Sequence, residues 1–195
     1  MGSGSLDCDA SRVQLVEPCI ENYASQNFDN LPMATLHGDF NDANILLHGK
    51  EWGILDVGDC VYSWRVNDVA IGAAYVMVNL CTPENERTGF SDKGDHVAVQ
   101  GAQKFVEGFL ERSTLSKDEK RALPHLIAAR LATSFTLGWY SYRESLAAQP
   151  DMPKQRRDYL LHHALPAATA LDVCLEATSL VADWPTTTPT RDPRR

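Results

Sequence analysis

The fold is organised around residues 37–59 of the 195-residue chain, which read HGDFNDANILLHGKEWGILDVGD. Short apolar runs alternate here with polar segments, and this pattern predicts a strand, a loop, a second strand, a turn and a third strand. The Gly-containing turn at residues 49–50 joins two of the runs and predicts a β-hairpin. We expect the hairpin to bring Asp39, Asn44 and Asp56 close together at one end.

The three polar residues at that end suit phosphoryl transfer. An aspartate can accept the proton of an attacking hydroxyl, while an asparagine and a second aspartate hold Mg²⁺ on the nucleotide phosphates. Mg²⁺ prefers oxygen ligands and uses few carboxylates beside phosphates and water. The order H-x-D-x-x-x-x-N, then D-x-G, is typical of a kinase catalytic loop and its metal-binding aspartate. We therefore predict Asp39 as the catalytic base and Asn44 and Asp56 as Mg²⁺ ligands, with turn and strand-end roles as the alternatives.

The residues around this pattern resemble a known family. His37 is followed by Gly38, where protein kinases carry Arg, which resembles the aminoglycoside phosphotransferase and choline kinase superfamily of small-molecule kinases. Within that superfamily, the segments HGDFNDANIL and GILDVGDCVYSWRVNDVAIGAAYVMV are similar to the hydroxylysine kinase family. The similarity extends, less specifically, over most of residues 36–183.

This resemblance implies both a fold and an activity. The fold would be α+β and mainly α, a protein-kinase-like C-terminal lobe in which a small β-hairpin carries the catalytic loop beside four to six helices. The activity would be transfer of the γ-phosphoryl group of GTP or ATP, with Mg²⁺, to a hydroxyl of a small cationic amino-bearing substrate, 5-hydroxy-L-lysine in the family. Choline, ethanolamine, homoserine and aminoglycoside-type acceptors suit the same residues, and the oligomeric state stays open. A non-catalytic kinase-like interaction module is the alternative from another class of function.

Four further residues have expected roles near the predicted site. By resemblance, the His37 ring holds the catalytic loop in shape, and we assign it no proton transfer. Asp68 occupies the place of the family's acidic residue that braces this loop, although the dipole of the following helix also favours an aspartate there. Asp42 and Asp59 are candidate contacts for a substrate ammonium group, with solvated carboxylates as the alternative.

The parts of a kinase that lie outside this lobe are not recognisable. A complete kinase has a Gly-rich loop over the phosphates and a strand lysine before the catalytic loop. No G-x-G-x-x-G is present, and Lys50 follows the catalytic loop instead of preceding it. We therefore expect the N-terminal nucleotide lobe to be absent from a truncated form, with apolar surface left exposed and poor nucleotide affinity.

Composition narrows the classes of function. The net charge of −8 argues against a surface for nucleic acid or for an anionic membrane. No apolar run approaches the roughly 18 residues that a membrane span needs, and the apolar core of a signal peptide is lacking. The five cysteines are scattered without C-x-x-C spacing. They predict reduced thiols in a cytoplasmic protein, with neither a disulfide framework nor a zinc site.

The remaining signals divide the chain into segments. We expect a flexible leader at residues 1–10, a catalytic lobe at 11–184 and a disordered tail at 185–195. Residues 60–63 are expected to form a turn in which Ser63 caps the next helix. Apolar periodicity and capping signals predict helices at residues 11–26, 64–80, 95–111, 116–148 and 154–183, the last kinked or divided near Pro166.

Overall fold

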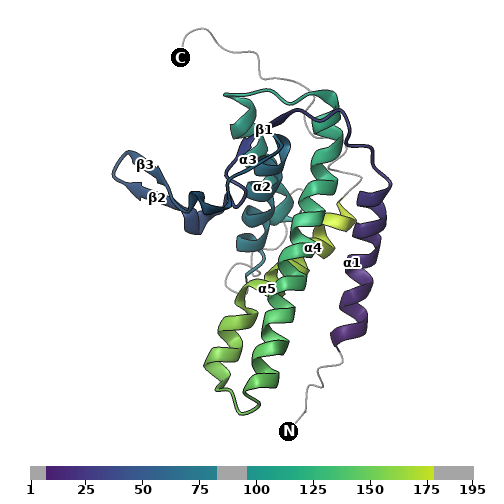
Figure 1. Cartoon of the computed structure of the whole chain (residues 1–195), viewed down its shortest axis with the longest axis vertical. Helices are drawn as coiled ribbons and strands as arrows, with labels where there is room; N and C mark the ends of the chain where they lie inside the picture. The colour runs from purple at the N-terminus through teal and green to yellow at the C-terminus, as the bar shows by residue number, and fades with distance from the viewer. Residues whose placement is uncertain (1–7, 83–95, 178–195) are drawn as a thin grey trace.

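The computed structural model describes residues 8–82 and 96–177. Within these ranges the chain is mostly helical, with two small antiparallel strand pairs, as the α+β expectation required (Figure 1). The elements in chain order are α1 (Cys8–Ala24), β1 (Met33–Leu36), the 3₁₀ turn η1 (Asp42–Asn44), β2 (Ile45–His48), β3 (Glu51–Ile54), the 3₁₀ turn η2 (Val57–Asp59), β4 (Val61–Trp64), α2 (Val66–Leu80), α3 (Val97–Leu110), α4 (Lys117–Ala148) and α5 (Lys154–Glu176).

The hydrophobic core lies among the helices. Helix α4 packs against α5, α2 and α1, and α2 also packs against α3. Helix α2 is apolar on most sides, as a central helix must be, and most of its side chains are buried. The largest fully buried apolar side chains of the core are those of Leu123, Ile127, Leu131 and Leu171, from α4 and α5.

The strands form two separate antiparallel pairs. Strands β2 and β3 make the predicted hairpin, with Ile45 opposite Ile54 and His48 opposite Glu51. Strand β1 pairs with β4, which the sequence did not indicate. Residues 60–63 were expected to be a turn, and that expectation is wrong because residues 61–63 belong to β4. Ser63 lies opposite Ala34 in this pair and does not cap α2.

The helix boundaries correct two further expectations. Helix α1 begins at Cys8, within the segment expected to be a flexible leader. Helix α5 continues through Pro166 without being divided, because the residues that follow Pro166 pack into the core and hold the helix despite the missing backbone donor. The expected end of this helix near residue 183 and the tail at 185–195 lie outside the described residues.

A buried ion pair ties the strands to the longest helix. The predicted capping box at the start of α4 is present, with Ser116 accepting from Glu119 N and Glu119 accepting from Ser116 N. Glu119 is fully buried, and its carboxylate also accepts two hydrogen bonds from Arg65, of 3.0 and 2.8 Å. The hydrogen bond to Glu119 raises the pKa of the Arg65 guanidinium further above its ordinary value. The junction between β4 and α2 is therefore fastened to the first turn of α4.

The β2–β3 hairpin projects away from the helices (Figure 1). Its apolar side chains stay exposed, with exposed fractions of 61% for Leu47, 73% for Trp52 and 58% for Ile54. Exposed apolar groups of this size are typical of interaction surfaces. No helix in the two described ranges is both long and apolar enough to cross a membrane.

Candidate active site

The loop after β1 carries the first predicted residues and is held by α2. The backbone N–H groups of His37 and Gly38 donate to the two carboxylate oxygens of Asp68, at 2.8 and 3.0 Å. Asp68 stands in the first turn of α2. Because one carboxylate accepts from two consecutive amides, it fixes the direction in which the loop leaves the strand. Asp68 is therefore positioned for the bracing role that the sequence suggested.

The His37 ring connects the same loop to the hairpin. Its Nε2 lies 2.7 Å from the carbonyl oxygen of Leu55, and its Nδ1 lies 3.4 Å from the N–H of Asp39. Since Nδ1 accepts from this amide, the neutral ring carries its proton on Nε2 and donates it to Leu55. Both ring nitrogens are thus engaged in backbone contacts, which suits a structural role for His37.

Gly38 brings the loop against η2. Its φ of +85° lies in the left-handed region, and an added Cβ would lie 2.4 Å from the carbonyl oxygen of Asp59. Only glycine combines this φ with so close an approach. The two parts of the motif, separated by the hairpin in sequence, therefore meet at Gly38 and Asp59.

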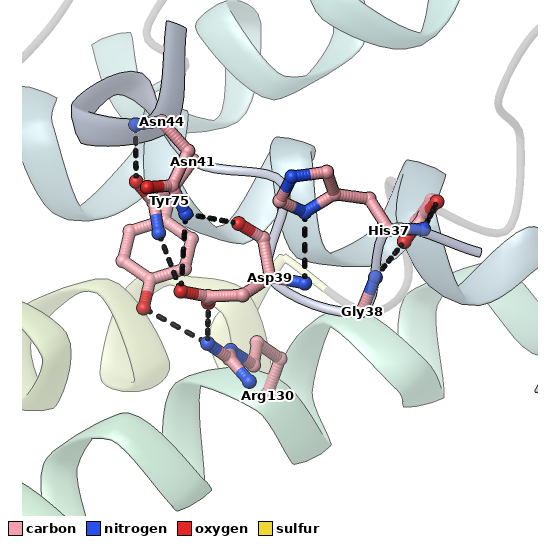
Figure 2. Close-up of polar contacts among 8 residues, drawn as sticks. His37, Gly38, Asp39, Asn41, Asn44, Tyr75 and Arg130 are labelled. Atoms are coloured by element: carbon pink, nitrogen blue, oxygen red, sulfur yellow. Dashed lines mark hydrogen bonds and ion pairs between the residues drawn. The ribbon is translucent and has the colours of Figure 1, made fainter. Parts of the chain in front are cut away.

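Asp39 lies at the centre of a polar cluster (Figure 2). Its Oδ1 accepts from Arg130 Nη2 at 2.6 Å, and its Oδ2 accepts from Asn41 Nδ2 at 2.9 Å and more weakly from Asn44 Nδ2 at 3.4 Å. A carboxylate offers about four lone-pair directions, so these three donors leave one on Oδ1 for a further hydroxyl. Asp39 is held in place without being saturated.

Asn44 is the link between Asp39 and the hairpin. Its Nδ2 donates to the backbone carbonyl oxygen of Asp39 at 2.9 Å, and its own carbonyl oxygen accepts from Leu55 N at 2.9 Å. The side-chain Oδ1 of Asn44 therefore remains as the atom that could coordinate a cation. The hairpin register places Asp56 just beyond this point, with an exposed side chain and a left-handed φ of 55°.

The predicted Mg²⁺ ligands form a sparse donor set. No group of three His, Cys, Asp or Glu side chains that could hold a metal ion occurs in the described ranges. Asn44 and Asp56, which would contribute one amide oxygen and one carboxylate, both lie at the base of the hairpin. This set fits Mg²⁺ bound to a nucleotide, since Mg²⁺ takes its other ligands from phosphates and water.

The two candidate substrate contacts lie in different surroundings. Asp42 lines a pocket of about 410 Å³ between η1, α2 and α4, together with Asn41, Tyr75 and Arg130. Asp59 is exposed in η2 and is not among the residues that line this pocket. The structure therefore brings Asp42, but not Asp59, to a concave site next to the Asp39 cluster.

Arg130 and Asn41 are site residues that the sequence reasoning missed. Arg130 comes from α4, ninety-one positions after Asp39, and also donates from Nη2 to the Tyr75 hydroxyl at 2.9 Å. The sequence could have indicated Arg130, because it lies on α4 near the buried residues Ile127 and Leu131, and a charge among buried residues requires a partner. Asn41 caps η1 through its side-chain oxygen while its Nδ2 holds Asp39. That dual role cannot be seen in its residue type alone.

The chain is similar to known phosphotransferases. Residues 8–100 match the family described as phosphotransferase enzyme family, APH. Curated proteins named hydroxylysine kinase match over longer segments. Those of Bos taurus and Mus musculus are 33% and 30% identical over 115 residues, which cover 54% of this chain and 27% of each relative. That of Danio rerio is 30% identical over 143 residues, which cover 68% of this chain and 36% of the relative.

These similarities bear out the resemblance that the sequence suggested. The chain spans between 27% and 36% of the length of the curated relatives it matches. The family match ends at residue 100, and so includes Asp39, Asn44 and Asp56 but neither α4, with Arg130, nor α5. Residues 8–100 are therefore similar to the APH phosphotransferase enzyme family.

Proposed function

We propose that this chain forms the protein-kinase-like C-terminal lobe of a small-molecule kinase. It would transfer the γ-phosphoryl group of GTP or ATP to a hydroxyl of an amino-bearing acceptor, with 5-hydroxy-L-lysine as the acceptor suggested by the relatives. The observation that carries the proposal is the direct contact between Asp39 and Asn44 at the base of the hairpin that leads to Asp56. A catalytic base next to a pair of oxygen ligands is the arrangement that phosphoryl transfer requires.

In this proposal Asp39 positions and deprotonates the acceptor. The acceptor hydroxyl would donate to the open lone pair of Asp39 Oδ1, and the proton would pass to this carboxylate. The hydroxyl oxygen bonds to the γ-phosphorus as the bond from that phosphorus to the β–γ bridging oxygen breaks, and the nucleoside diphosphate leaves. The contacts from Asn41 and Arg130 hold the carboxylate in place, which supports catalysis by positioning.

Asn44 and Asp56 would hold the cation of the nucleotide. Mg²⁺ bound there would neutralise negative charge on the phosphates. Asn44 is suited to this because its Nδ2 is fixed by Asp39, which orients Oδ1. Asp56 is suited because its carboxylate is exposed at the end of the same hairpin. Asp68 and His37 would act as supports of the loop, through the contacts described above.

The exposed apolar residues of the hairpin and of η2 would suit a further nucleotide-binding lobe that packs on this face. Leu47 and Trp52 in the hairpin and Val57 in η2 are each more than half exposed, as expected for side chains that pack against another surface. We propose that such a lobe, from the same polypeptide or another, supplies the contacts to the nucleotide base and phosphates. Among the described residues, Cys19, Cys60 and Cys174 carry free thiols, which fits the proposal of a cytoplasmic protein.

One observation favours the alternative of a non-catalytic interaction module. Both carboxylate oxygens of Asp39 already accept hydrogen bonds, from Arg130 and Asn41. A chain that used this cluster only as a structural centre would bind a partner through the apolar hairpin and would transfer no phosphate.

The two functions differ in whether Asp39 is needed for turnover. The test is transfer of the γ-phosphoryl group from GTP or ATP to 5-hydroxy-L-lysine, followed by ³¹P NMR. The parent chain should form the phosphate ester, and Asp39→Asn should lower the rate by roughly 100-fold or more while the fold is retained. The control Asp151→Asn removes the same charge in the turn between α4 and α5 and should keep the parent rate. Equal rates for Asp39→Asn and the parent would overturn the proposal, whereas absence of turnover with every donor would show that this chain is inactive without a further lobe or is the non-catalytic module.

A further inference from the structure

Aromatic side chains connect the loop that carries Asp39 to α3, a helix with no role in the proposal so far. The Phe40 ring, which directly follows Asp39 in the chain, lies 6.4 Å from the Phe105 ring of α3, centre to centre, with the ring planes tilted by 45°. Phe40 also meets the His37 ring edge to face, at 6.2 Å. At both distances aromatic rings attract each other. The loop therefore has an apolar contact with a helix in addition to its hydrogen bonds.

The Phe105 ring rests on α2 at Gly72. A Cβ added at Gly72 would overlap the Cζ atom of Phe105 and would lie 2.8 Å from its Cε1 atom, closer than real side chains approach. The ring therefore uses space that only a glycine at position 72 leaves open. Phe105 also packs against the hydrophobic core of the helices. Because contacts on two sides hold the ring in place, it is a fixed support.

Phe40 depends on such a support. Among the described residues, Phe40 is half-buried and belongs neither to the core nor to the partly buried side chains that pack against the core. Its contact with Phe105 links it to that core. Since Phe40 shares a peptide bond with Asp39, a shift of its ring moves the backbone from which the Asp39 carboxylate extends. A displacement of about 1 Å at a reacting group can lower a rate roughly 100-fold.

We propose that Phe105 is a positioning residue for the predicted base and acts on Asp39 through the Phe40 ring. The inference rests on the proposed kinase function, which gives Asp39 its role. Asp68 fixes the backbone before Asp39, and Arg130 holds the carboxylate itself. Phe105 fixes the backbone that follows. The predicted base is thus held from three helices, α2, α3 and α4.

The test compares Phe105→Ala with Phe109→Ala. Phe109 lies one turn later on α3, is likewise half-buried and packs against the same core, so both variants lose an aromatic ring from the same helix. The side-chain amides of Asn41 and Asn44 report on Asp39, because both donate to its Oδ2. Their signals in ¹⁵N–¹H NMR spectra should move in Phe105→Ala and stay at the parent positions in Phe109→Ala.

Transfer of the γ-phosphoryl group to 5-hydroxy-L-lysine gives a second readout. Phe105→Ala should lower kcat by about tenfold or more and leave KM for the nucleotide unchanged, because a displaced base slows the chemical step alone. Phe109→Ala should keep the parent kcat. A contribution of Phe105 to stability alone would reduce the amount of folded chain and leave kcat per folded molecule unchanged.

A second pair of variants decides the question should Phe105→Ala fail to fold. Phe105→Leu keeps an apolar side chain in the core but removes the ring, and Phe40→Leu removes the partner ring from the loop. Because both variants break the same contact, the shifts of the Asn44 side-chain signal should not add in the double variant. Additive shifts would overturn the inference, since the two rings would then act independently.

The outcomes separate this inference from the function on which it rests. Parent-like Asn41 and Asn44 signals in Phe105→Ala would overturn it. Equal shifts in Phe109→Ala would also overturn it, because the effect would then come from the stability of α3. The same holds if the signals move while kcat per folded molecule is unchanged. Absence of turnover in the parent chain would bear on the kinase function, and the NMR comparison would then decide whether Phe105 positions Asp39.

Discussion

Leucine side chains are buried in the helical core but exposed in the β2–β3 hairpin. Leu131 in α4 is fully buried, whereas Leu47 in β2 is 61% exposed. Burial of apolar surface is the main favourable term in folding, so the stability of the chain resides in the helices. The hairpin contributes little to that core, and its exposed apolar side chains are typical of a surface that other molecules contact.

The candidate site lies at the seam between these two regions. Helices supply Asp68 and Arg130, and the residues that flank the hairpin supply Asn44 and the Leu55 carbonyl that accepts from the His37 ring. The loop at Asp39 is therefore held from both sides. A rigid support on one side and an exposed surface on the other is typical of functional loops.

The largest difference is expected for leucine truncation in the two regions. Leu131→Ala should lower the free energy of unfolding by about 3 kcal/mol, because it removes buried methyl groups and leaves a cavity. Leu47→Ala should change it by less than about 0.5 kcal/mol, because the side chain is already exposed. Urea unfolding of both variants measures the difference. Similar losses would contradict the division between core and hairpin.

The next effect concerns the buried ion pair that fastens β4 to α4. Glu119→Gln should cost about 2 kcal/mol, less than for a wholly buried pair because Arg65 is 37% exposed. Asp118→Asn, which affects the exposed pair with Arg121, should cost less than about 0.5 kcal/mol. Urea unfolding of the two variants gives the comparison, and equal midpoints would show that Glu119 makes no special contribution.

Gly38 and Gly49 differ in how closely the surrounding structure packs against them. Both have a positive φ, but a Cβ on Gly38 would meet the Asp59 carbonyl whereas a Cβ on Gly49 has nothing within 4 Å. Gly38→Ala should therefore cost about 1 kcal/mol more than Gly49→Ala and displace the loop at Asp39. Denaturation gives the cost, and amide chemical shifts around residues 37–39 give the displacement. Parent-like shifts in Gly38→Ala would refute the close packing of loop and η2.

The smallest effect is a dependence of stability on pH that comes from α4. Burial lowers the pKa of His125 from its ordinary value of 6.5, so the folded state favours the neutral ring. Stability from this group is complete above pH 6.5 and declines below it, because the unfolded chain takes up the proton first. His125→Gln should flatten the fall of Tm between about pH 7 and about pH 5. An unchanged pH profile of Tm in His125→Gln would contradict the role of His125 in the pH dependence of stability.

Local patterns predicted the elements that depend on local sequence. The hairpin around the turn at residues 49–50, the apolar helix α2 and the capping box at Ser116 and Glu119 were all foreseen, because each is specified by neighbouring residues. The pairing of β1 with β4 was not, since it joins strands that are too short to show a period of their own. Ser63 was assigned as a cap on residue type alone, and strand pairing took precedence.

The site shows the same division. The spacing of His37, Asp39 and Asn44 predicted the catalytic loop. The hydrogen bonds among these three residues join positions that are close in sequence. Arg130 reaches Asp39 from a helix that follows much later in the chain, and no local pattern specifies such a contact. The catalytic and metal-binding roles of Asp39, Asn44 and Asp56 stay predictions until the site is tested directly.

The most direct test of the central claim is paramagnetic NMR of this chain with Mn²⁺ and GTP, and in parallel with ATP. Mn²⁺ replaces Mg²⁺ at oxygen ligands and reports weak binding by broadening nearby amide signals. The account predicts nucleotide-dependent broadening centred on Asn44 and Asp56, lost in Asp56→Ala and kept in Asp151→Ala at the distant α4–α5 turn. Broadening that is centred elsewhere, or that survives in Asp56→Ala, would contradict the proposed phosphoryl-transfer site.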